Sequence, residues 1–132
     1  MSQHAPSPLD ETADPQKLRV LVVDDDPDSA ESLAFSLQLE GRQVRYATCA
    51  RDALKVAETL SPHFALIDVF MPQVDGHALA AELRQRFGHQ IVVVAVTGAL
   101  KSVELNAFDH HLMKPINFMQ LDELLSQQRR SS

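Results

Sequence analysis

Side chains that could do chemistry follow several short apolar runs of this 132-residue chain. Three consecutive aspartates, Asp24 to Asp26, follow the first run, Asp68 follows the third, Thr97 the fourth and Lys114 the fifth. Carboxylates gathered in one place repel one another, and either protons or a cation must offset that repulsion. We predict Mg²⁺, because it prefers hard oxygen ligands and is commonly held by one or two carboxylates together with phosphate oxygens.

Each of these residues, taken alone, also has a structural explanation. The three aspartates could form a turn and a helix cap, and Asp68 could be a solvated strand end. Thr97 or Lys114 alone would indicate little about function. Their joint placement at the ends of successive apolar runs is what favours a common site.

The elements that must position these residues follow from the apolar pattern. Five runs predict strands, and the first, third and fourth are apolar almost throughout, as strands covered on both faces are. Four stretches with apolar residues at three- and four-residue spacing predict helices. The strands are expected at 18–23, 44–47, 64–67, 91–96 and 112–113, and the helices around 30–37, 50–57, 79–87 and 118–125.

This alternation predicts an α/β fold with an open, doubly wound parallel sheet and helices on both faces. Because the carboxyl ends of parallel strands meet at one edge, where such folds bind ligands, the polar residues should share one site. We expect the first helix to begin near Asp28 or Ser29. Residues 1–17 are predicted to be a flexible N-terminal tail, 18–128 one folded domain and 129–132 a polar C-terminal tail.

Composition narrows the possible partners. The formal net charge is −6, and the chain shows no basic stripe for a nucleic-acid backbone. Its start lacks the features of a signal peptide, and its longest apolar run, Ile91 to Val96, is too short to cross a bilayer. The single Cys49 fits a reducing compartment, and no cysteine and histidine set suggests zinc. We therefore expect a cytoplasmic protein that binds neither nucleic acid nor membrane.

Four motifs carry a resemblance to a known family, the response-regulator receiver domains of two-component signal transduction. The motifs are LVVDDDPDS, ALIDVFMPQVDG, VVAVTG and HHLMKP. They occur in the same order as in the family, and the resemblance extends from Leu18 to about Gln128. The resemblance is to single-domain, chemotaxis-type receivers, and it implies a flavodoxin-like sheet with strand order 2-1-3-4-5. It also implies a sensor histidine kinase or a histidine phosphotransfer protein as phosphoryl donor and a protein target downstream.

The same resemblance assigns roles to individual residues. It implies that Asp68 accepts the phosphoryl group. Asp24 and Asp25 form the acidic pair for Mg²⁺, with Asp25 as the direct ligand, while Asp26 falls outside that pair. The backbone carbonyl of Phe70 would be a further ligand of the metal, as would Asp68.

Three more roles come from the family. Thr97 would hydrogen-bond a phosphoryl oxygen, and Lys114 would pair with the phosphoryl group or with Asp68. Thr97 and His111 would act as the switch, and the Lys114–Pro115 peptide bond would be cis. The domain would be a signalling module and not an enzyme, apart from Mg²⁺-dependent self-phosphorylation and self-dephosphorylation.

Two features depart from the family pattern. His111 stands where an aromatic residue is usual. The segment 99–107 is shorter than usual by roughly five residues, more than a helical turn, which predicts a shortened or irregular helix between the fourth and fifth strands. We expect phosphorylation to order this segment.

Two alternatives remain open from the sequence. One is a haloacid-dehalogenase-type phosphatase, because Asp24 and Asp26 flank one residue after an apolar strand; Asp28, however, stands where that class wants threonine or valine. The other is an interaction module that kept the site but no longer uses phosphate.

Overall fold

Five parallel strands form the central sheet of the computed structural model, which describes residues 17–71, 74–98 and 108–131. The strand order is β2-β1-β3-β6-β7. Counted along the sheet alone this is the order 2-1-3-4-5, so the predicted topology is confirmed. The strands are β1 (Arg19–Val23), β2 (Gln43–Ala47), β3 (Phe64–Asp68), β6 (Val92–Thr97) and β7 (His110–Met113).

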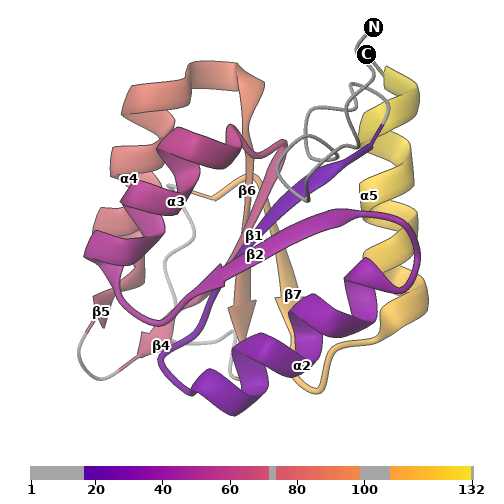
Figure 1. Ribbon diagram of the computed structural model, residues 1–132, viewed down its shortest axis with the longest axis horizontal. Coiled ribbons are helices and arrows are strands. Elements are labelled where there is room, and N and C mark those ends of the chain that lie inside the picture. The colour runs from indigo at the N-terminus through magenta and orange to yellow at the C-terminus, as the bar shows by residue number, and fades with distance from the viewer. Residues whose placement is uncertain (1–16, 72–73, 99–107, 132) are drawn as a thin grey trace, which may run out of the picture.

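Helices cover both faces of this sheet. In Figure 1, α3 and α4 lie on one side of the strands and α2 and α5 on the other. Each predicted helical stretch falls within one of them, which confirms the doubly wound arrangement. The helices are α2 (Pro27–Gln38), α3 (Ala50–Leu60), α4 (Gly76–Phe87), followed by the 3₁₀ turn η1 (Gly88–Gln90), and α5 (Phe118–Ser131).

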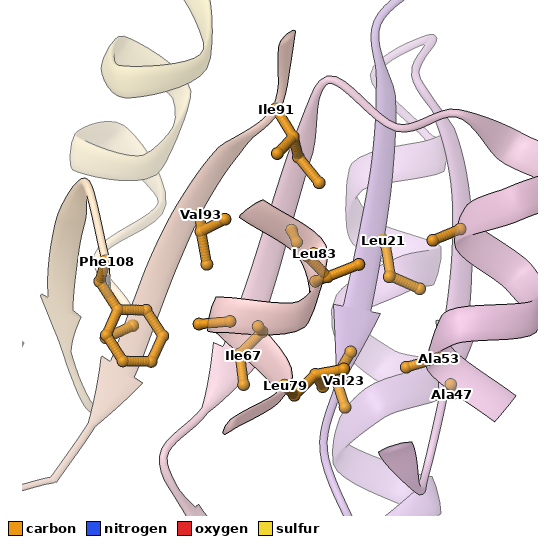
Figure 2. Packing of buried hydrophobic residues seen from close by; sticks show 14 of the residues in the cluster. Leu21, Val23, Ala47, Ala53, Ile67, Leu79, Leu83, Ile91, Val93 and Phe108 are labelled. Carbon is orange, nitrogen blue, oxygen red and sulfur yellow. The ribbon is translucent and has the colours of Figure 1, made fainter. Parts of the chain in front are cut away.

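Successive side chains along a strand point to opposite faces of the sheet, so the hydrophobic core is divided into two clusters, one on each face. In β1, Leu21 and Val23 pack toward α3 and α4, whereas Val20 and Val22 pack toward α2 and α5. Figure 2 shows the first cluster, where leucines of α4 meet the sheet and Phe108 closes one side. β1, β3 and β6 are buried on both faces, as their unbroken apolar sequences predicted.

The first helix begins at Pro27, close to the start that the sequence analysis expected. Its N-cap is Asp26, whose carboxylate accepts a hydrogen bond from the Asp28 backbone N–H at 3.2 Å and from the Ser29 hydroxyl at 2.8 Å. Pro27 follows as the first helical residue, where its fixed φ suits the helix and its missing N–H costs nothing. The start expected near Asp28 or Ser29 is thus confirmed to within one or two residues, and the third aspartate serves as the cap.

A short antiparallel pair, β4 (Phe70–Met71) and β5 (Val74–Asp75), was not predicted. It follows β3 directly and leads to Gly76 at the start of α4. A Cβ atom at Gly76 would lie 3.1 Å from the Val69 Cα, tighter than most Cβ contacts, so glycine lets the helix start close to the strand without displacing it.

The predicted N-terminal tail up to residue 16 and the short 99–107 segment lie outside the described residues. Helix α5 continues to Ser131, past the predicted domain end at residue 128. No helix within the described ranges is long and apolar enough to cross a membrane.

Candidate functional site

Asp24 is positioned at the carboxyl end of β1 by two backbone hydrogen bonds. Its N–H donates to the Ala47 carbonyl of the neighbouring strand at 3.1 Å, and its Oδ1 accepts from the Asp26 N–H at 3.0 Å. The residue is buried. The first two aspartates of the DDD sequence thus contribute carboxylates to the site, and the third holds Asp24 through its backbone N–H and caps α2.

Asp68 lies at the carboxyl end of β3, next to β6. Asp68 is in register with Val96 of β6. The backbone N–H of the next residue, Val69, donates a hydrogen bond to the Val96 carbonyl at 3.1 Å. The Asp68 side chain is only 9% exposed, and its Oδ2 accepts a hydrogen bond from the Lys114 Nζ at 3.0 Å. This pair joins residues that are far apart in the sequence, as the strand-end argument predicted.

Thr97 and Lys114 complete the edge from the next two strands. Thr97 is fully buried at the end of β6, and its carbonyl accepts from the Lys114 N–H at 2.8 Å. The Lys114–Pro115 peptide bond is cis, so this prediction is confirmed.

Carboxylate oxygens of Asp24, Asp25 and Asp68 all lie within 4.8 Å of one another, close enough to hold one metal ion. Asp25 is the most exposed of the three. The Lys114 Nζ lies 3.9 Å from Asp24 Oδ2 as well as 3.0 Å from Asp68 Oδ2, so its ammonium is close to two of the three carboxylates. The donor set consists of hard oxygens, which fits Mg²⁺ and does not fit zinc.

The pKa values at the site reflect this crowding. The pKa of Asp24 is raised above its ordinary 3.8, first by burial and then by the charges of Asp68 and Asp25, against the hydrogen bond from Asp26 and the charge of Lys114. Burial by itself would lower the pKa of Lys114. The hydrogen bond and charge of Asp68, with the charges of Asp24 and Asp25, outweigh burial and raise that pKa above 10.5.

The other predicted site residues lie around this centre. Phe70 begins β4, two positions after Asp68. His111 lies in β7 beside Ala95, two positions before the Thr97–Met113 pair, and its side chain is exposed. The predicted residues of the described ranges therefore gather at one edge, with His111 set back along the neighbouring strand.

Sequence reasoning missed the serines of α2 that face this site. Ser29, Ser32 and Ser36 line a cavity that also reaches Asp68 and Lys114. Their spacing of three and four residues was visible in the sequence, but only the positions of the helix and the sheet show what they face.

Fold and site together define a class, the doubly wound α/β proteins with a cluster of carboxylates at the carboxyl edge of the sheet. A family model described as "Response regulator receiver domain" matches residues 20–126. The chain therefore belongs to the response regulator receiver family and is the receiver domain of a two-component response regulator. This membership removes the dehalogenase-type phosphatase as an alternative.

Two relatives illustrate the range of the family. The "Uncharacterized 14.6 kDa protein in sodA1 3'region" of Leptolyngbya boryana is 33% identical over 117 residues, which cover 84% of this chain and 89% of the relative. The response regulator MprA of Mycolicibacterium vanbaalenii is 34% identical over 117 residues, covering 85% of this chain but 49% of the relative. The chain thus spans about half the length of MprA.

A solved structure shares both the fold and 28% of the sequence. The response regulator TrrA of Thermotoga maritima, crystallised in complex with Mg²⁺-BeF, matches with a TM-score of 0.73 over 83% of this chain and 97% of TrrA. TrrA in complex with the histidine kinase ThkA matches with a TM-score of 0.72 over the same shares. A metal-bound state and a kinase complex are therefore known for a structural relative.

Proposed function

We propose that this domain receives a phosphoryl group on Asp68, from a phosphohistidine of a sensor histidine kinase or a histidine phosphotransfer protein, and that Mg²⁺ is required. The observation that carries this proposal is the site itself. Three carboxylates lie within 4.8 Å of one another, and the one at the end of β3 is paired with Lys114 at 3.0 Å.

The reaction needs few groups from the protein. A carboxylate oxygen of Asp68 attacks phosphorus, the P–N bond of the phosphohistidine breaks, and the imidazole leaves with the bonding electrons and takes up a proton. The product is an acyl phosphate, which can pass its phosphoryl group on to water. Positioning and charge neutralisation supply most of the catalysis in such transfers.

Each neighbouring residue has a place in this scheme. Asp24, Asp25, Asp68 and the carbonyl of Phe70 would hold Mg²⁺, which when bound neutralises charge on the phosphoryl oxygens. The ammonium of Lys114 lies against Asp68 and would follow the transferred group. The raised pKa of Lys114 keeps it charged at neutral pH.

The output would be a change of surface. Thr97, buried at the end of β6, would hydrogen-bond a phosphoryl oxygen and shift toward it. His111 lies on the adjacent strand with an exposed side chain, and it would turn inward behind Thr97. A downstream protein target would read the rearranged surface.

The remaining assignments form part of the same proposal. Residues 18–128 would be the receiver, between an N-terminal tail up to residue 17 and a C-terminal tail from residue 129. The protein would act in the cytoplasm, bind neither nucleic acid nor membrane, and turn over only its own phosphoryl group.

Intact-mass spectrometry with a small phosphodonor and Mg²⁺ tests the proposal. Wild type should gain one labile phosphoryl group, and it should not do so in EDTA. Asp68→Asn should gain none. Asp26→Asn is the matched control, because asparagine caps a helix as well as aspartate does and Asp26 lies outside the acidic cluster. Equal labelling of Asp68→Asn and wild type would contradict the proposal.

A further inference from the structure

A cavity of about 740 Å³ lies beside the candidate site, between α2, the sheet and the connection from β7 to α5. In Figure 1 this is the region where α2 approaches the start of α5. Side chains of Val22, Leu66 and Val96 form part of the lining from the sheet, and Ile116 and Phe118 contribute from the connection and α5. A volume of this size falls within the range of pockets that bind small molecules.

The sequence of α2 explains why this space is open. Ser29, Ser32, Leu33 and Ser36 lie at three- and four-residue spacing and therefore share one face of the helix, the face that lines the cavity. Ser29 and Ser32 are exposed and Ser36 is half-buried, so the cavity opens to solvent along this face, and the short serine side chains keep its mouth wide. The buried side of α2 is anchored by Ala30, Ala34 and Leu37.

One end of the cavity carries charge. Asp24, Asp68 and Lys114 line it, so two carboxylates face one ammonium, and Asp25 adds a third negative charge nearby. The two lining carboxylates are largely buried, with side-chain exposures of 13% and 9%, and partial burial strengthens their attraction for a cation.

We propose that this cavity binds a small amphipathic cation, with its apolar body between α2 and the sheet and its ammonium or amidinium head against Asp24 and Asp68. The charges of the site favour a cationic head group, because the site presents more carboxylates than ammonium groups. The apolar lining favours an apolar body for the rest of the ligand. Such a ligand would compete with Mg²⁺ for the same carboxylates, so it would inhibit phosphorylation; only this last consequence rests on the proposed function.

Three probes with the same apolar body test the choice of head group. 3-Phenylpropylamine, 3-phenylpropanol and 3-phenylpropionate are titrated into the full chain in EDTA, and binding is followed by the NMR methyl signals of Val22, Leu66 and Val96. We expect the amine to bind saturably and at least tenfold more tightly than the alcohol, and the carboxylate to bind most weakly. No binding of the amine, or equal binding of all three, would overturn the proposal.

Variants test the location. Ser36→Leu should weaken amine binding about tenfold by filling the cavity, and leucine is the better helix former, so the fold should persist. Thr59→Leu, at an exposed position of α3 on the other side of the sheet, is the matched control and should bind like wild type. Lys114→Met should tighten amine binding, because it removes the competing ammonium. A loss of amine binding in Lys114→Met, or full binding by Ser36→Leu, would contradict the assigned site.

Competition separates this inference from the proposed function. Mg²⁺ should raise the apparent Kd of the amine linearly with the free Mg²⁺ concentration, a result that needs no phosphoryl transfer. Amine binding that Mg²⁺ does not affect would place the head group away from the carboxylates and overturn the proposal. Failure of Asp68 to accept phosphate would leave the binding result intact, because binding is measured without a phosphodonor.

Discussion

The two faces of the sheet are packed differently. Between the sheet and helices α3 and α4, Leu79, Leu83 and Phe108 fill the space against the strands (Figure 2). Between the sheet and helices α2 and α5, a cavity of about 740 Å³ remains beside Asp68 and Lys114. The first face holds the strand ends in place, and the second leaves the chemical groups accessible.

The difference originates in which side chains the helices present. Helix α4 turns Leu79, Ala80 and Leu83 toward the sheet, and Gly76 lets its first turn approach the backbone of β3 closely. Helix α2 turns Ala30, Ala34 and Leu37 inward but offers serines toward the site. A closely packed face transmits strain, whereas side chains that line an open pocket have room to move, so perturbations of the two faces should have unequal effects.

The largest effect should come from truncating the packed face. Leu83→Ala removes a fully buried side chain and should lower the free energy of unfolding by about 3–4 kcal/mol. Leu33→Ala, at a half-buried position that already lines the cavity, should cost about 1 kcal/mol. Urea unfolding of both variants measures the difference. Equal losses would show that the α2 face is packed as tightly as the α4 face.

The close contact at Gly76 should be the next most sensitive position. Gly76→Ala puts a Cβ 3.1 Å from the Val69 Cα and 3.4 Å from the Asp68 carbonyl oxygen, so β3 or α4 must shift at a cost of about 1–3 kcal/mol. At Gly98 an added Cβ meets nothing within 4 Å, so Gly98→Ala serves as control. Thermal unfolding compares the two. A Gly76→Ala protein as stable as Gly98→Ala would mean that the strand yields freely there.

A moderate increase in stability, in contrast to the losses above, is expected from a substitution at the site. Asp24→Asn should raise the melting temperature by a few degrees in EDTA, because it removes a buried carboxylate that repels Asp68 and Asp25. Asp28→Asn, an exposed aspartate outside the cluster, is the control. Mg²⁺ should stabilise wild type more than Asp24→Asn.

The same repulsion contributes to the pH dependence of the free energy of unfolding. The pKa of Asp24 is higher in the folded protein than its ordinary 3.8, so the folded state holds the proton more tightly than the unfolded chain does. Wild type in EDTA should therefore lose stability relative to Asp24→Asn as the pH rises from 3.8 through the raised pKa, with a constant difference above it. A difference that shrinks as the pH rises would contradict this sign.

The smallest effects should come from the ion pairs at the edges of the two faces. Arg86 pairs with Glu58 between α4 and α3, and Arg42 pairs with Asp122 of α5 on the other face. Glu58→Gln should cost about 0.2–0.5 kcal/mol, because the Arg86 pair is well exposed. Asp122→Asn should cost more, about 1 kcal/mol, because the Arg42 side chain is only 12% exposed. Unfolding in low and high salt should separate the two.

Much of this architecture could be predicted because it depends on pattern. Unbroken Val and Ile runs predict strands buried on both faces, and the polar residue after each run predicts the edge at which they meet. That reasoning brought Asp24, Asp68, Thr97 and Lys114 together before any coordinates were considered. The Lys114–Pro115 cis bond came only from the family resemblance.

Other features depend on distances that a sequence does not contain. The family resemblance placed Asp26 outside the metal pair, but its role as the N-cap of α2 follows only from its contacts with the Asp28 N–H and the Ser29 hydroxyl. The β4 and β5 pair is too short for any periodicity to show. The cavity requires knowing how far α2 lies from the sheet, which no residue of α2 reveals by itself.

Identification of the modified atom tests the central claim most directly. Wild type is phosphorylated with Mg²⁺ and a small phosphodonor, reduced with borohydride, and analysed by tandem mass spectrometry, because reduction of an acyl phosphate converts the aspartate to homoserine. We predict homoserine at residue 68, with residues 24, 25 and 26 unchanged. Homoserine at residue 24 or 25, or a label that survives as a stable phosphoester elsewhere, would contradict the account.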